Sequence, residues 1–145
     1  MVARTIAFME FELRNQGVTA SLALSEQRPR VIADHIQIEQ VLVNLCYNAM
    51  QAMSVLPVGQ RKLRVETSVS GSDMAQIGVI DSGPGIAPEN LARLFEPFFT
   101  TKSQGLGMGL NISRSIVENH GGRLTASPNP PSGMRFDFTL PLQTG

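Results

Sequence analysis

The stretch LRVETSVSGSDMAQIGVI, residues 63–80, predicts two β-strands joined by a tight turn. Strand-forming residues fill 63–70 and 75–80, and Gly71-Ser72-Asp73 between them is a hairpin signal. Asp81 follows directly, so we expect its carboxylate at the end of a strand. An antiparallel pair therefore forms the centre of the predicted fold.

Further elements are predicted on both sides of this hairpin. Asp34 can cap a helix, and Gly17 and Gly121-Gly122 can end two others. Ile6, Met9, Phe11 and Leu13 give the first helix an irregular apolar face. The predicted helices cover residues 4–15, 35–53, 88–94 and 108–119, and the additional predicted strands cover 18–24, 31–33, 123–127 and 135–140.

The order of these elements predicts the fold class. Regular strand-helix-strand alternation is absent from the sequence, which argues against a doubly wound parallel sheet. We expect one α/β domain over residues 1–145, a two-layer α/β sandwich with a mixed, mostly antiparallel sheet and helices packed on one face.

Composition restricts the partners and the compartment. Twelve basic and twelve acidic residues balance, which argues against a nucleic-acid partner. No stretch reaches the roughly twenty apolar residues of a membrane span, so we expect no direct membrane insertion. Cys46 is the single cysteine and lies in an apolar run, which favours a buried thiol and a reducing cytoplasm. We expect the isolated domain to be monomeric.

The helix over 35–53 carries an unusual stripe of amides. A helix face in water is normally built from Lys and Glu, whereas neutral amides suit the wall of a cavity. Asn44 and Asn48, one turn apart, could each direct a carbonyl oxygen at Mg²⁺ or phosphate-bound water. Hydrogen bonds from a partly buried helix to a nearby loop remain the simpler alternative. The stripe consists of Gln37, Gln40, Asn44, Asn48 and Gln51.

Asp81 begins the turn Asp81-Ser82-Gly83-Pro84-Gly85-Ile86. A carboxylate there can accept a hydrogen bond from the amine of adenine and would oppose the carbonyl of guanine, which selects ATP over GTP. Gly83 and Gly85 would leave room for a base. An ordinary Asp-Ser-Gly turn is the alternative.

A second glycine-rich turn, Gly105-Leu106-Gly107-Met108-Gly109-Leu110, opens the helix near 108–119. Its backbone N–H groups could meet phosphate oxygens, although a flexible tether has the same composition. Before it, three phenylalanines within residues 95–99 precede Thr100-Thr101-Lys102, which suits an anchored lid with one positive charge. Core packing of the rings and a solvated lysine are the alternative.

Four motifs in this order resemble the N, G1, F and G2 boxes of sensor histidine kinases. They are Asn44-Leu45-Cys46-Tyr47-Asn48-Ala49, the Asp81 turn, Leu94-Phe95-Glu96-Pro97-Phe98-Phe99 with Thr100-Thr101-Lys102, and the turn from Gly105. The lid is most similar to that of the nitrogen-regulation, oxygen-sensing and dicarboxylate-sensing kinases. His120-Gly121-Gly122 and Gly133-Met134-Arg135-Phe136 resemble the closing part of the same catalytic domain.

The resemblance implies a Bergerat-type ATP-binding fold with ATP and Mg²⁺ as cofactors. It places Asp81 on adenine, Asn48 on Mg²⁺, and both Asn44 and Lys102 in catalysis. Gln51 stands where many relatives carry Lys or Arg, which leaves more of the phosphate charge to Mg²⁺ and Lys102. The cofactor-binding positions that the resemblance implies are Asn44, Asn48, Ala52, Asp81, Gly83, Gly85, Ile86, Phe98, Thr101, Lys102, Gly105, Leu106, Gly107, Met108, Gly109, Leu110 and Thr139.

The reaction expected from this resemblance is transfer of the γ-phosphate of ATP to a histidine. Related ATPases carry a glutamate base where this chain has Asn44, so water lacks an obvious activator here. Neither His35 nor His120 has the setting of a phosphoacceptor. The expected partners are therefore the dimerisation and histidine-phosphotransfer helices of the parent kinase, and a downstream response regulator. An ATPase, an anti-sigma-like serine kinase and a non-catalytic nucleotide-binding module remain the alternatives.

Overall fold

The computed structural model describes residues 1–27, 29–96 and 109–143. Its centre is a five-stranded sheet with the order β1-β2-β3-β5-β4. Strand β1 pairs with β2 in parallel, and the remaining pairings are antiparallel, which confirms the mixed, mostly antiparallel sheet. The strands are β1 (Thr19–Ala23), β2 (Lys62–Ser70), β3 (Met74–Asp81), β4 (Leu124–Pro128) and β5 (Met134–Pro141).

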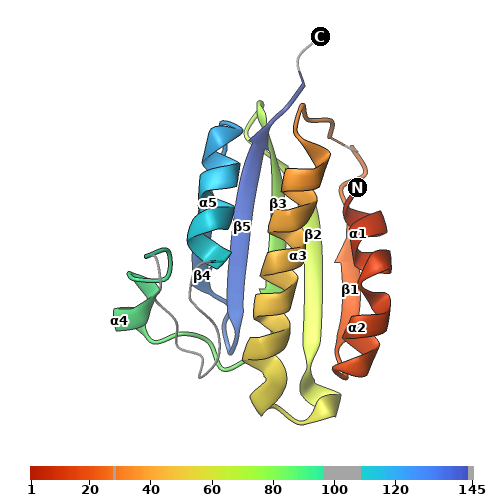
Figure 1. Cartoon of the computed structure of the whole chain (residues 1–145), viewed down its shortest axis with the longest axis vertical. Helices are drawn as coiled ribbons and strands as arrows, with labels where there is room; N and C mark the ends of the chain where they lie inside the picture. The colour runs from red at the N-terminus through yellow and green to blue at the C-terminus, as the bar shows by residue number, and fades with distance from the viewer. Residues whose placement is uncertain (28, 97–108, 144–145) are drawn as a thin grey trace.

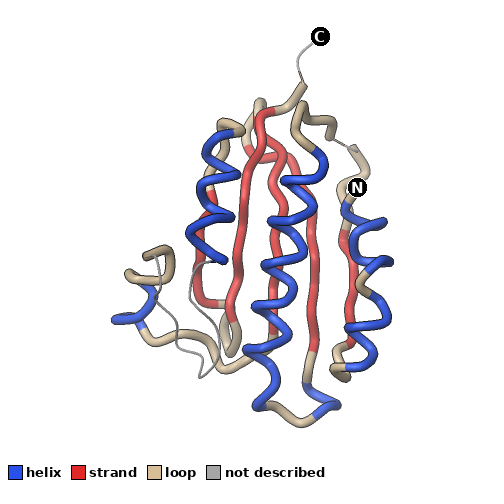
Figure 2. Tube along the Cα trace, viewed as in Figure 1, coloured by secondary structure: helices blue, strands red, loops and turns tan. Residues whose placement is uncertain are grey.

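Helices cover one face of this sheet, as Figure 1 shows, and α4 lies to one side. Figure 2 separates the helical layer from the strands behind it and confirms the two-layer α/β arrangement. The helices are α1 (Val2–Phe8), α2 (Glu10–Asn15), α3 (His35–Ala52), α4 (Pro88–Leu91) and α5 (Gly109–Asn119), with the 3-10 turns η1 (Met53–Val55) and η2 (Val58–Gln60).

The core lies between α3 and the sheet. Strand β5 alternates strictly, with Met134, Phe136, Phe138 and Leu140 buried and the residues between them half-buried. This period of two directs every second side chain toward the helices. Each fully buried apolar side chain of this kind contributes about 1.5–3 kcal/mol. Core packing therefore fixes the register of β5, and with it the position of the loop that precedes β5.

Cys46 belongs to this core. Its side chain is 0% exposed, and burial raises the pKa of the thiol to about 12. The thiol therefore stays protonated and inert at neutral pH, because the thiolate is the reactive form. The structure confirms the prediction that this residue acts as a small buried hydrophobe.

Hydrogen bonds join the start of α3 to the end of α5. Asp34 caps α3 as predicted, with Oδ1 accepting from the backbone N–H groups of Ile36 at 3.0 Å and Gln37 at 3.1 Å. The N–H of Asp34 donates in turn to Nε2 of His120 at 3.1 Å, and Nδ1 of His120 lies 2.8 Å from the carbonyl oxygen of Ile116. A neutral imidazole satisfies both contacts.

Several predicted elements differ from the observed ones. The helix over 4–15 divides at Met9, and Phe11 is 79% exposed because it lies on the side away from Ile6 and Leu13. The predicted strand over 31–33 is a single bridge from Val31 to Leu142. Strand β1 is mostly exposed rather than half-buried, because it lies at the sheet edge. Helix α4 ends at Leu91, before a series of turns.

Candidate nucleotide site

The carboxylate of Asp81 is held rigidly at the end of β3. Its side chain is 4% exposed, and Oδ1 accepts hydrogen bonds from the N–H groups of Gly83 at 2.8 Å and Met134 at 3.2 Å. No residue in the described part of the chain donates to Oδ2. One carboxylate oxygen thus fixes the side chain, and the other is left to accept from a ligand.

Burial raises the pKa of Asp81, and the two backbone N–H bonds oppose that rise only in part. Desolvation disfavours the charged form of a carboxyl group. The ionised carboxylate is therefore poorly solvated by the protein and gains from a further hydrogen-bond donor. The amine of adenine is a donor of this kind.

Close backbone packing builds the turn after Asp81. A Cβ atom on Gly83 would lie 3.0 Å from Oδ1 of Asp81 and 3.3 Å from the carbonyl oxygen of Ala52, so this turn rests on the end of α3. Gly85 has φ +83°, and a Cβ there would lie 3.4 Å from the carbonyl oxygen of Gly133. Gly133, at φ +106°, has room for no side chain beside the backbone of Asp81. Three glycines thus allow two loops to meet at the carboxylate.

Ser82 fastens the same turn on its other side. Its hydroxyl donates to the carbonyl oxygen of Gln60 at 2.7 Å and accepts from the N–H of Lys62 at 2.9 Å. The turn is therefore tied both to the start of β2 and to the end of α3. Sequence reasoning missed Ser82, since serine in an Asp-Ser-Gly turn carries no signal beyond turn propensity.

Asn44 lies farther along α3, where α5 begins. Its Nδ2 donates to Oγ of Ser113 at 2.9 Å, and a Cβ on Gly109 would lie 2.8 Å from both Nδ2 and Oδ1. Asn48 is half-buried and lies on α3 between Asn44 and Ala52. At 1.5 Å per residue, Asn44 and Ala52 are roughly 12 Å apart along the helix axis. Helix α3 therefore connects the Asp81 turn to the first turn of α5.

Part of the predicted site lies outside the described residues, namely Phe98, Thr101, Lys102, Gly105, Leu106, Gly107 and Met108. The structure describes the residues on either side of that segment. Ile86 and Leu110 are half-buried and pack against the core. The guanidinium of Arg114 on α5 lies 5.0 Å from the ring centroid of Phe95, a cation–π contact.

Thr139, which the resemblance places near the base, lies apart from the residues around Asp81. It lies on β5 five residues beyond Met134, roughly 17 Å at 3.4 Å per residue. Because side chains alternate along β5, it faces away from the helices. There its Oγ1 accepts from the N–H of Arg123 at 3.0 Å. Met134, whose N–H contacts Asp81, occupies the position beside the carboxylate.

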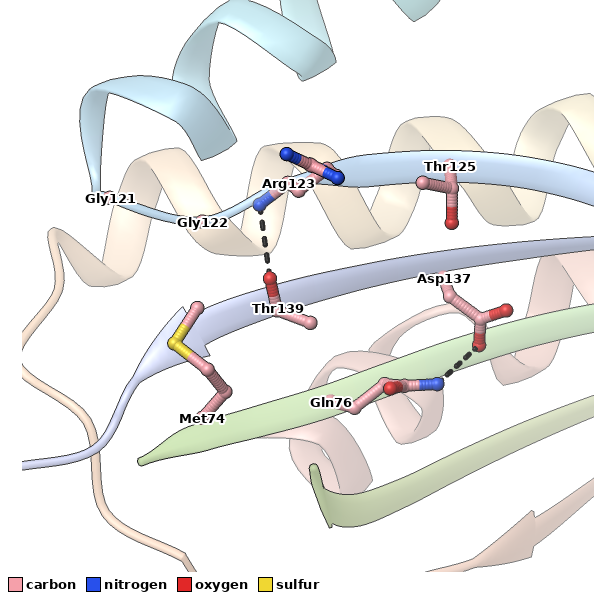
Figure 3. A pocket seen from close by; sticks show the side chains of 8 residues that line it. All are labelled: Met74, Gln76, Gly121, Gly122, Arg123, Thr125, Asp137 and Thr139. Carbon is pink, nitrogen blue, oxygen red and sulfur yellow. Dashed lines mark hydrogen bonds between the residues drawn. The ribbon is translucent and has the colours of Figure 1, made fainter. Parts of the chain in front are cut away.

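Figure 3 shows the surroundings of Thr139, a pocket of about 450 Å³ on the outer face of the sheet. Gln76 donates to Asp137 within it at 3.2 Å. Gly121 and Gly122 also line it. Among the predicted nucleotide residues that the structure describes, Thr139 alone lines this pocket, and Asp81 does not.

Residues 33–144 match the family described as histidine kinase-, DNA gyrase B-, and HSP90-like ATPases. The chain belongs to this family. Sensor protein FixL of Bradyrhizobium diazoefficiens is 44% identical to it over 128 residues, which are 88% of this chain and 25% of FixL. The chain thus spans about a quarter of the length of that relative.

Solved structures of histidine kinases share the fold of this family member. The nucleotide-free catalytic domain of ThkA superimposes with a TM-score of 0.83 at 32% identity, covering 97% of this chain and 89% of that one. ThkA in complex with the response regulator TrrA gives 0.81 at 29% identity, covering 98% and 39%. Full-length ShkA in complex with AMPPNP gives 0.83 at 26% identity, covering 99% and 29%. The architecture is that of a histidine kinase catalytic domain.

The donor set suits a magnesium–nucleotide complex better than a magnesium ion alone. Within the described ranges, no group of three or more His, Cys, Asp or Glu side chains could hold a metal. Mg²⁺ usually keeps several waters and binds through one or two protein oxygens together with substrate phosphates. The half-buried amide of Asn48 fits that requirement as a single oxygen ligand.

No described helix is long and apolar enough to cross a membrane.

Proposed function

We propose that this domain binds Mg-ATP between the Asp81 turn and the start of α5, and transfers the γ-phosphate to a histidine on a separate helical dimerisation domain. The observation that carries the proposal is the divided role of the Asp81 carboxylate, in which Oδ1 is anchored by two backbone N–H groups and Oδ2 accepts from no described residue. A fixed acceptor of this kind recognises the amine of adenine and repels the carbonyl of guanine.

The remaining proposed contacts follow α3 toward α5. Asn48 would supply an oxygen to Mg²⁺, and Asn44 would lie at the phosphates, where the N-terminus of α5 favours negative charge. Bound Mg²⁺ would neutralise charge on the transferring phosphoryl group. Lys102 would add a positive charge, and Gln51, exposed on α3, adds none. ShkA, which shares the fold, was solved in complex with AMPPNP.

Asn44 favours a kinase over an ATPase. Attack of water on the γ-phosphate needs a general base to remove a proton from the water. The amide of Asn44 cannot accept a proton at neutral pH. A neutral imidazole is already nucleophilic, so positioning and charge stabilisation suffice for transfer to histidine.

The described histidines support an acceptor outside this domain. Both ring nitrogens of His120 are engaged, Nδ1 with the carbonyl oxygen of Ile116 and Nε2 with the N–H of Asp34. His35 is the first residue of α3 and is directly preceded by its cap. We propose that the acceptor lies on the dimerisation helices of a parent kinase, and that a response regulator then receives the phosphate. ThkA was solved in complex with such a regulator, TrrA.

Calorimetric titration of the chain with ATP and GTP, each with Mg²⁺ and with excess EDTA, tests nucleotide recognition. Asp81→Asn should lower the affinity for ATP about a hundredfold, because an amide N–H would then oppose the adenine amine and leave both donors unpaired. The preference for ATP over GTP should shrink at the same time. Asp73→Asn, at an exposed hairpin position, is the matched control and should change nothing. Equal ATP affinity in Asp81→Asn and the wild type would reject the proposed site.

A further inference from the structure

We infer that Arg61 is a positioning residue of the proposed nucleotide site, which holds the ends of α2 and α3 and the start of β2 in the arrangement on which the Asp81 turn rests. The inference rests on the proposed function, because the effect of Arg61 is measured as affinity for ATP. Arg61 belongs to none of the four sequence motifs, and the contacts of its guanidinium group carry the argument.

Arg61 directly precedes β2 and connects that strand to the ends of two helices. Nη1 donates to the carbonyl oxygen of Gln16 at 2.7 Å, at the end of α2. Nε donates to the carbonyl oxygen of Leu56 at 3.0 Å and Nη2 to that of Ser54 at 3.1 Å, both just beyond α3. The ends of α2 and α3 and the start of β2 lie together at the lower end of the molecule in Figure 1.

The three contacts depend on the shape of an arginine side chain. A guanidinium presents five N–H donors on three nitrogen atoms in a rigid, planar fork. The ammonium group of lysine carries its donors on one nitrogen atom and cannot reproduce that fork. A positive charge is also favourable at the end of a helix, where the carbonyl groups carry partial negative charge. Arg61→Lys therefore keeps the charge and removes the three-way connection.

The main chain of Arg61 contacts the same N-terminal region as its side chain. The N–H of Thr19, the first residue of β1, donates to the carbonyl oxygen of Arg61 at 2.9 Å. Between Gln16 and Thr19, a Cβ on Gly17 would lie 2.8 Å from Cγ1 of Val58, so this part of the chain rests on the turn before Arg61. Arg61 thus holds the connection between α2 and β1 at two points.

Both neighbours of Arg61 contact Ser82, the residue that follows Asp81. The hydroxyl of Ser82 donates to the carbonyl oxygen of Gln60 at 2.7 Å and accepts from the N–H of Lys62 at 2.9 Å. Arg61 therefore lies between the two groups that fasten the Asp81 turn, and a shift of its main chain would move both of them. Loss of the guanidinium contacts should weaken the proposed adenine contact of Asp81, in which Arg61 itself takes no part.

The connection should act in both directions, because coupling between binding and a distant arrangement is reciprocal. If the contacts of Arg61 favour binding of ATP, bound ATP must in turn stabilise those contacts. The backbone N–H groups of Val18 and Thr19 report on them, since they donate to the carbonyl oxygens of Leu13 and Arg61. Saturation of the wild type with Mg-ATP should slow hydrogen exchange of these two N–H groups by about threefold or more.

Calorimetric titration with Mg-ATP compares three substitutions with the wild type. Arg61→Lys should lower the affinity about tenfold, as should Ser82→Ala, which removes the next link of the connection. Arg4→Lys, at an exposed position of α1, is the matched control and should leave the affinity unchanged. Combining Arg61→Lys with Ser82→Ala should lose no more than the larger single effect, whereas independent effects would multiply to about a hundredfold.

Hydrogen exchange separates this role from a merely structural one. In Arg61→Lys and in Ser82→Ala, saturating Mg-ATP should no longer slow exchange at Val18 and Thr19. Unchanged affinity of Arg61→Lys would overturn the inference, as would a fully multiplicative loss in the combined variant. If Arg61→Lys does not fold, Ser82→Ala decides alone, and protection of the two N–H groups equal to that in the wild type overturns the inference.

The same titrations distinguish failure of the inference from failure of the proposed function. A wild type that does not bind ATP would reject the proposed function and the inference with it. A wild type that binds ATP, with Arg61→Lys binding equally well, would reject the inference alone.

Discussion

Asp81 has a raised pKa because it is buried, and this gives a pH dependence with a definite sign. A group whose pKa is raised by folding stabilises the fold when protonated and loses that contribution as pH rises through the folded pKa. Asp81→Asn, which stays neutral and still accepts from Gly83 and Met134, should therefore be more stable than the wild type at pH 7. The difference should shrink as the pH falls toward 4. Urea unfolding of both proteins across this range measures it.

Protonation of Asp81, which stabilises the fold, should weaken the binding of ATP. Protonated Asp81 carries a hydrogen where adenine needs an acceptor, so ATP affinity should fall at acid pH. The decline should begin at a higher pH than an ordinary solvated aspartate would give. Calorimetric titrations at successive pH values provide the profile. A flat profile down to pH 4 would contradict the proposed contact between this carboxylate and the base.

The junction of α3 and α5 allows a test in which helix propensity and function oppose each other. Alanine is about 1 kcal/mol more favourable than glycine inside a helix, so Gly109→Ala should not weaken α5 as a helix. Its new methyl group would nevertheless displace the Asn44 amide, and we expect at least a tenfold loss of Mg-ATP affinity. Gly59→Ala is the matched control, because a Cβ there meets nothing within 4 Å. Unchanged binding by Gly109→Ala would show that the amide need not stay in place.

At the other end of the same helix pair, His120 connects α5 to the cap of α3. His120→Ala removes both contacts and should lower the free energy of unfolding by about 1–2 kcal/mol. His35→Ala, on the exposed first turn of α3, should change it by less than about 0.5 kcal/mol. Chemical denaturation measures both values. Equal effects of the two substitutions would remove His120 from the account of how α3 and α5 are joined.

As a whole, the molecule should act on a partner rather than on itself. Incubated with radiolabelled Mg-ATP, the chain alone should remain unlabelled. A separately purified dimerisation domain from a related sensor histidine kinase should become labelled on histidine when the chain is added. Asp81→Asn should abolish this labelling, and Asp73→Asn should leave it intact. Self-labelling would place the acceptor in this chain, and steady phosphate release without labelling would favour an ATPase.

Local signals in the sequence predicted most elements correctly. Asp34 caps α3, Gly71 turns the β2–β3 hairpin at φ +64°, and Gly121 follows α5 at φ +84°. Such features depend on a few neighbouring residues, so one chain is enough to predict them. The short strand at 31–33 and the continuous first helix failed, because tertiary packing decides elements with weak local preference.

The site was only partly predictable, for a physical reason that differs from residue to residue. The outward orientation of Thr139 was predictable, since apolar residues at 134, 136, 138 and 140 already indicate that odd positions face outward. The contact between Ser113 and Asn44 could not have been found, because it depends on α5 lying beside α3. Gly133 acts through a close backbone approach to Asp81 that no sequence spacing reveals.

Because Cys46 is fully buried, a fluorescent dye can be attached to this molecule at a chosen site. At 0% exposure and with a thiol that stays protonated, it should not compete for a maleimide dye. A single cysteine introduced at an exposed site such as Ser115 would then carry the only fluorophore. Nucleotide binding beside α5 could be followed by emission from that one reporter, without first replacing the native thiol.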